Sequence, residues 1–107
     1  MPEPPVKFVS EEEIRKIFND NNYISRIKSK EFTKETIYNM HVTRTKPRIP
    51  RCSRSQIISY FDKEGQEITR VHRYLKRDGT LGGSGMPDPK ALFHDNILYL
   101  LPDISLA

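Results

Sequence analysis

Three side chains that could do chemistry together, Arg70, His72 and Tyr74, lie at alternate positions of the segment EITRVHRYL. If this segment is a β-strand, residues two apart project from the same face. The trio then has the parts of a metal-independent ribonuclease site. His72 would be the general acid or base near neutral pH, Arg70 would neutralise charge on a phosphate, and Tyr74 would position or stack a base. The competing interpretation is an ordinary solvent-facing strand surface.

Positive charge is concentrated in one third of the chain. Residues 21–55 hold nine Lys or Arg and two Asp or Glu, a net charge of +7, whereas the whole chain carries +4. Residues 41–55 contain no carboxylate, and five cations follow one another there: Arg44, Lys46, Arg48, Arg51 and Arg54. Such a cluster favours an anionic partner, most simply the phosphates of a nucleic acid. The alternative is a solvated basic linker, because a basic cluster is only an electrostatic footprint.

The segment DGTLGGSG, residues 78–85, is rich in glycine and could present backbone N–H groups to a phosphate. No Lys follows these glycines, as a Walker A loop requires, and the spacing G-x-G-x-x-G is absent. A flexible hairpin loop is the favoured interpretation.

Metal and cofactor chemistry finds no support in the residue spacing. His41, His72 and His94 are too scattered for a metal-ligand motif, and no fingerprint of a cofactor site is complete. Cys52 is the single cysteine of the chain, so it forms no internal disulfide, and we interpret it as an inert thiol. We therefore predict neither a metal nor a cofactor.

The composition predicts one small soluble domain. The chain has 107 residues, 30% of them charged, and no apolar run approaches the roughly 20 residues of a membrane span. The first residues have neither the basic nor the apolar region of a secretory signal. Together with the lone cysteine, these features indicate a cytoplasmic protein with no membrane partner.

Periodicity separates a helical N-terminal part from a strand-rich remainder. Ser10 and Glu13 have the spacing of a capping box, which predicts a helix over residues 11–19, whereas residues 23–30 fit either a second short helix or a loop. From residue 32 the apolar period becomes two, with turn residues at 63–66, 78–79 and 95–96. We expect a disordered tail over residues 1–8 and a single α+β domain over residues 9–107. In that domain one or two N-terminal helices pack on a four- to five-stranded, mainly antiparallel sheet.

Half of the chain carries a recognisable string of motifs. Residues 54–65 read RSQIISYFDKEG, residues 70–80 read RVHRYLKRDGT, and residues 84–90 read SGMPDPK. This block resembles a group of short bacterial conserved hypothetical proteins with R-S-Q-I, R-V-H-x-Y-L-x-x-D-G-T and S-G-x-P-D-P-K in this order. The resemblance implies a bacterial origin and brings no mechanism with it.

Two functions lead from the sequence, ahead of a small-molecule enzyme, for which no cofactor fingerprint is present. The first is a small basic protein that binds RNA or DNA through the cations of residues 44–54, and that in one form would cleave RNA at His72. The second is a protein-binding module without enzymatic activity, such as an accessory or inhibitor subunit, which the lack of a complete enzyme motif favours.

Overall fold

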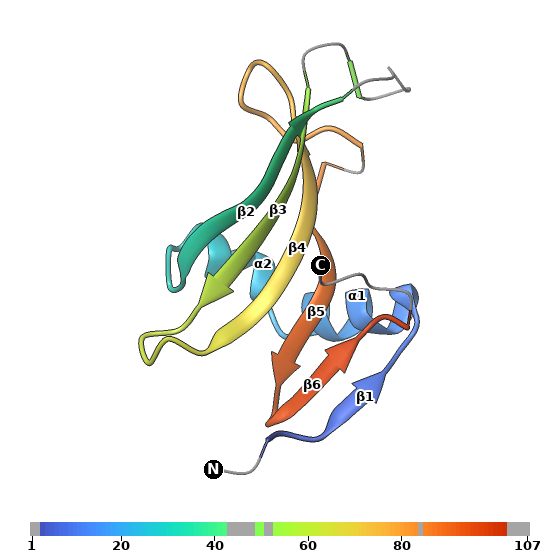
Figure 1. Ribbon diagram of the computed structural model, residues 1–107, viewed down its shortest axis with the longest axis vertical. Coiled ribbons are helices and arrows are strands. Elements are labelled where there is room, and N and C mark those ends of the chain that lie inside the picture. Colours follow the sequence, from blue (N-terminus) through green and yellow to red (C-terminus); the bar gives the residue numbers. More distant parts are fainter. Residues whose placement is uncertain (1–2, 43–48, 51–52, 84, 103–107) are drawn as a thin grey trace.

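The computed structural model describes residues 3–42, 49–50, 53–83 and 85–102. One strand precedes two consecutive helices, and five further strands follow. Both helices lie behind the sheet in Figure 1. In chain order the elements are β1 (Val6–Phe8), α1 (Glu11–Asp20), α2 (Tyr23–Lys28), β2 (Thr33–His41), β3 (Arg54–Phe61), β4 (Glu67–Leu75), β5 (Asp88–His94) and β6 (Ile97–Leu100). The predicted α+β class is confirmed, and of the two alternatives for residues 23–30, helix or loop, the structure has the helix α2.

One sheet holds all six strands in the order β1-β6-β5-β4-β3-β2. Neighbouring strands are antiparallel, except that β1 runs parallel to β6. The prediction of a mainly antiparallel sheet is therefore confirmed, whereas the predicted number of four to five strands is too low.

The additional strand comes from the segment that we expected to be a tail. Val6–Phe8 form β1, and the backbone N–H groups of Val9 and Leu98 donate to the carbonyls of Leu100 and Pro5, both at 2.9 Å. The expectation of disorder over residues 1–8 is thus wrong for this strand. The proline-rich composition misled it, because the prolines precede the strand and leave its ladder donors intact.

Helix α1 begins as its sequence predicts. The Glu13 N–H donates to the Ser10 hydroxyl at 3.1 Å, while the Glu13 carboxylate contacts that same hydroxyl rather than the Ser10 N–H. Ile14 and Phe18, one turn apart, are fully buried against the sheet. The cap and the apolar stripe together fix where the helix starts and which side faces the core.

Helix α2 is short and is held mainly by aromatic packing. It begins after Asn22, whose φ of 61° turns the chain sharply away from α1. The ring of Tyr23 stacks on Phe18 and Phe32 at centroid distances of 5.6 and 6.4 Å. Its hydroxyl lies 2.8 Å from His94 Nδ1. These contacts attach α2 to the sheet and bring its C-terminal lysine beside β2.

Alternation along the central strands separates two faces of the sheet. Ile58 of β3 lies opposite Val71 of β4, and both are fully buried beneath the helices. The next pair in the register, Ile57 and His72, therefore projects from the opposite face. Gln56 and Arg73 follow and project towards the helices again. This alternation decides which charged side chains can meet.

Tight turns connect the strands where the sequence predicts them. Leu81 forms a bridge with Leu75, so the Asp78–Gly79 turn returns the chain beside the end of β4. Asp95 and Asn96 both have positive φ, of 50° and 63°, and connect β5 to β6. Such φ values at both central positions are typical of the hairpin turn that Asn and Asp tolerate.

Candidate functional site

The predicted trio lies on one face of β4, but it does not form one site. Arg70 turns towards its own strand and forms an ion pair with Glu67 at 3.0 Å. His72 and Tyr74 do meet, edge to face, with ring centroids 4.7 Å apart. The cation that was expected to stabilise a phosphate beside His72 is thus neutralised by a carboxylate three residues away.

His72 instead pairs with a hydroxyl on the neighbouring strand. Its Nε2 lies 2.8 Å from Ser55 Oγ. Burial lowers the pKa of His72, and Lys90 lowers it further, whereas Asp88 partly opposes the shift. The lowered pKa favours the neutral imidazole, which shares a hydrogen bond with the Ser55 hydroxyl.

A hollow of about 480 Å³ opens beside His72. It is lined by Ser10, Glu11, Ile57, His72, Lys90, Leu101 and Pro102. We call it the His72 hollow. Its lining holds one cation and one carboxylate beside apolar side chains, so its charge is nearly balanced.

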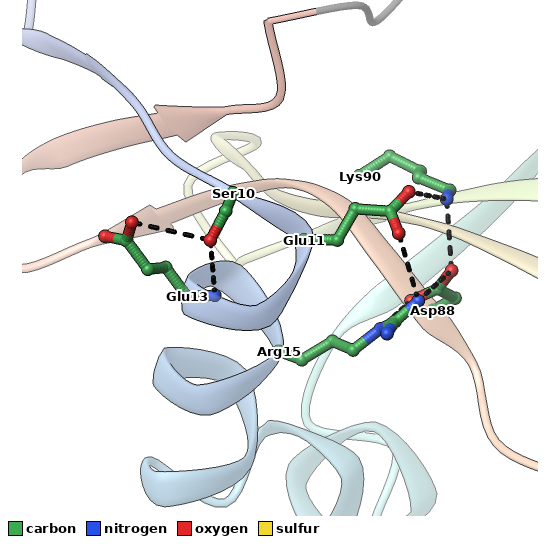
Figure 2. Close-up of polar contacts among 6 residues, drawn as sticks. All are labelled: Ser10, Glu11, Glu13, Arg15, Asp88 and Lys90. Atoms are coloured by element: carbon green, nitrogen blue, oxygen red, sulfur yellow. Dashed lines mark hydrogen bonds and ion pairs between the residues drawn. The ribbon is translucent and has the colours of Figure 1, made fainter.

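The cation of the His72 hollow belongs to an ion-pair network between α1 and β5 (Figure 2). Lys90 Nζ lies 3.0 Å from Asp88 and 3.8 Å from Glu11, while Arg15 Nε donates to Asp88 at 2.8 Å. Burial disfavours the charged form of Asp88, but the hydrogen bonds from Arg15 and Lys90 outweigh it and lower the pKa of this carboxyl. The network holds the first turn of α1 on the sheet, and its charges satisfy one another.

The face of the sheet beneath the helices holds a second hollow, of about 490 Å³. We call it the basic pocket. Lys28 of α2, Lys30 of the following turn, Lys34 of β2 and Arg73 of β4 line it, and no carboxylate does. Ile27, Phe32 and Tyr60 complete the lining. Within the described part of the chain, none of these four cations forms an ion pair.

A row of polar side chains runs from the basic pocket across three strands. Arg73 Nε donates to Gln56 at 2.9 Å, and Gln56 Nε2 donates to Asn39 at 3.3 Å. Arg54 donates to the same Asn39 oxygen at 3.4 Å and lies 3.2 Å from His41 Nε2. Since Arg54 and Gln56 are two residues apart in β3, they share a face. Arg54 therefore extends the positive surface towards the connection between β2 and β3.

Arg54 is the one member of the predicted nucleic-acid-binding set that the structure describes. The other four, Arg44, Lys46, Arg48 and Arg51, lie outside the described residues, as does Cys52.

The floor of the basic pocket is aromatic. Phe32 is buried, and Arg26 covers its ring at 4.9 Å while donating to Glu31 at 2.8 Å. Tyr60 is 4% exposed, and its hydroxyl forms no hydrogen bond to another described residue. Burial raises the pKa of Tyr60, and Arg73 opposes that shift only partly, so the hydroxyl keeps its proton.

The glycine-rich segment folds back on the protein. The N–H of Gly82 donates to the Tyr74 carbonyl at 2.8 Å and that of Gly85 to the Gly82 carbonyl at 3.0 Å. Two of its amides are thus used internally, which favours the hairpin interpretation over a phosphate cradle.

Neither a known protein-family model nor a curated protein or solved structure matches this chain. Among the described residues, no three His, Cys, Asp or Glu side chains gather as metal ligands would. No helix in the same part of the chain is long and apolar enough to cross a membrane.

Sequence analysis missed the basic pocket because four elements build it. One signal was present in the sequence: Arg73 shares the core-facing side of β4 with Val71, and a charged side chain is uncommon on a buried face. A second was the run of Lys28, Lys30 and Lys34 beside Phe32. Only the packing of α2 shows that these residues meet Arg73.

Proposed function

We propose that this protein binds nucleic acid through the face that carries the basic pocket and Arg54. The observation that supports this function is the set of four cations around one hollow without an ion-pair partner in the described structure. Neighbouring cations repel one another, which raises the electrostatic free energy of the unbound protein. An anionic ligand removes this repulsion when it binds.

Phosphates fit this surface better than a carboxylate-bearing small molecule does. Arg54 continues the positive surface beyond the pocket, along the same face of β3. A polyanion contacts both regions at once and releases counterions from each, which makes its affinity depend steeply on salt.

The direct test is a fluorescence-anisotropy titration with short single-stranded RNA and DNA at salt concentrations between about 50 and 200 mM. Each phosphate neutralised on a single strand should contribute about −0.7 to the slope of log K against log salt. Absence of binding at the lowest salt would refute the proposal.

The positions of His72 and Arg70 favour a protein that binds RNA without cleaving it. His72 and Arg73 are neighbours in β4, so the histidine and the basic pocket lie on opposite faces of the sheet. Arg70 is occupied by Glu67. We expect a labelled RNA incubated with the protein to stay intact, whereas cleavage that His72→Ala abolishes would restore the ribonuclease hypothesis.

A protein-binding function is supported by a different observation, at the edge of the sheet. All nine residues of β2 are exposed, and Ile37, Tyr38 and Met40 leave large apolar side chains in solvent. An unprotected edge can accept a strand from a partner. A stoichiometric protein partner that is lost on Ile37→Lys, with no nucleic acid recovered, would favour this second function.

A further inference from the structure

The basic pocket has the form of a receptor for one concentrated charge. Its cations come from α2, the following turn, β2 and β4, and they surround a single hollow. An internal phosphodiester carries one negative charge, whereas a phosphate monoester carries about −1.5 to −2 at pH 7. Because attraction grows with the charge of the ligand, convergent cations favour the monoester.

The donors in the pocket differ in geometry. Arg73 uses Nε for Gln56, so its two terminal nitrogens remain to donate in parallel to two phosphate oxygens. Lys28, Lys30 and Lys34 have no ion pair within the described chain and supply point charges around the rim.

Tyr60 is an independent observation that points to a ligand. This side chain is more than nine-tenths buried and lines the pocket, and its hydroxyl forms no hydrogen bond to another described residue. A phosphate oxygen in the pocket would accept a hydrogen bond from it.

The apolar part of the lining argues for more than inorganic phosphate. Ile27 and Phe32 form a wall beside the cations, and about 490 Å³ lies within the range of organic-ligand pockets. The sugar or base that follows an end phosphate can pack on such a wall, which requires a strand end that is not base-paired.

We propose that the basic pocket binds the terminal phosphate monoester of a single-stranded nucleic acid. The inference rests on the proposed function and specifies which part of the ligand enters the pocket.

The experiment compares single strands of one sequence that end in a 5′-phosphate, a 3′-phosphate or hydroxyls only, each with an internal fluorophore. We expect one phosphorylated end to bind about tenfold more tightly than the unmodified strand, because the pocket adds charge-assisted hydrogen bonds. The two phosphorylated strands show which end is recognised. Equal affinity for all three refutes end recognition but leaves the proposed function standing, whereas no binding by any strand refutes both.

Two variants test the role of the pocket itself. Tyr60→Phe keeps the buried ring and removes the hydroxyl, so the preference for the phosphorylated end should fall about threefold, while the cations keep the rest of it. Tyr38→Phe removes a hydroxyl from an exposed tyrosine of β2 and is the matched control, with the preference unchanged. Thermal unfolding verifies that both variants fold, and a preference as large in folded Tyr60→Phe as in the unchanged protein would contradict the assignment of this hydroxyl to the ligand.

Discussion

The two faces of β4 differ in whether their positive charges are paired with carboxylates. On the face of His72, Arg70 pairs with Glu67, and Lys90 of the adjoining β5 pairs with Asp88. On the face of Arg73, the cations gather without a carboxylate in the lining of their pocket. Paired cations are neutralised within the fold, and Arg15 with Asp88 also joins α1 to β5, whereas unpaired cations remain available to a ligand. The basic pocket therefore differs from the ion-pair network around Asp88 in whether its cations have carboxylate partners, more than in how many cations it has.

The largest effect should follow from removing charge in the basic pocket. Lys28→Gln with Lys34→Gln is expected to weaken binding of single-stranded RNA about 30-fold, for about 1 kcal/mol per exposed phosphate contact. The dependence of affinity on salt should also become less steep. Anisotropy titrations measure both quantities.

A charge-matched control makes this comparison specific. Lys7→Gln with Lys16→Gln removes the same charge from β1 and α1, outside the pocket. Binding weakened equally by both double variants would mean that overall charge, and not the pocket, holds the ligand.

The second effect concerns stability on the other face. Asp88→Asn removes the carboxylate that joins Arg15 to Lys90. Hydrogen bonds to a charged group contribute about 1.5–3 kcal/mol when buried, and partial exposure reduces this to about 1 kcal/mol here. We expect the melting temperature to fall by about 4–8 °C. Calorimetry measures the melting temperature, and RNA affinity should stay within twofold of the unchanged protein; lost affinity with unchanged stability would reverse the roles of the two faces.

A third, smaller effect appears in the pH dependence of stability. Burial and Lys90 lower the pKa of His72 in the folded state, so the unfolded chain takes up the proton first as pH falls. The contribution of His72 is complete above its unfolded pKa of about 6.5 and is lost as pH falls through the lower folded value. Urea unfolding between about pH 7.5 and 5 should show a smaller loss of stability in His72→Gln. Equal losses in both proteins would mean that this histidine is not desolvated.

The smallest effect is expected at the far end of the positive surface. Arg54 already contacts Asn39 and His41, so a phosphate there adds less than one in the pocket. Arg54→Gln should weaken binding by about two- to threefold, within the range of an exposed ion pair. A loss larger than that of Lys28→Gln with Lys34→Gln would move the centre of the interface to the connection between β2 and β3.

Local sequence rules predicted the elements of the fold well. Ser10 and Glu13 identified the start of α1, and the period of two in β3 and β4 placed Ile58 and Val71 in the core. These predictions succeed because caps and alternation depend on residues close together in the chain.

Features that depend on distant residues were predicted poorly. Strand β1 exists because β6 supplies its hydrogen bonds, and three residues give no period of their own. The trio on β4 was placed on the correct strand, but sequence could not show that Glu67 would take Arg70. The basic pocket brings Lys28 together with Arg73, which lies far from it in the sequence, and only the tertiary packing of α2 creates it.

The most direct test of the central claim uses two isoleucine methyl groups as reporters in NMR spectra. Ile27 lines the basic pocket and Ile57 lines the His72 hollow, so each reports on one face of the sheet. Titration with a single-stranded RNA should shift the δ-methyl signal of Ile27 and leave that of Ile57 in place. A shift at Ile57 with Ile27 unchanged would contradict the account and place the ligand beside His72.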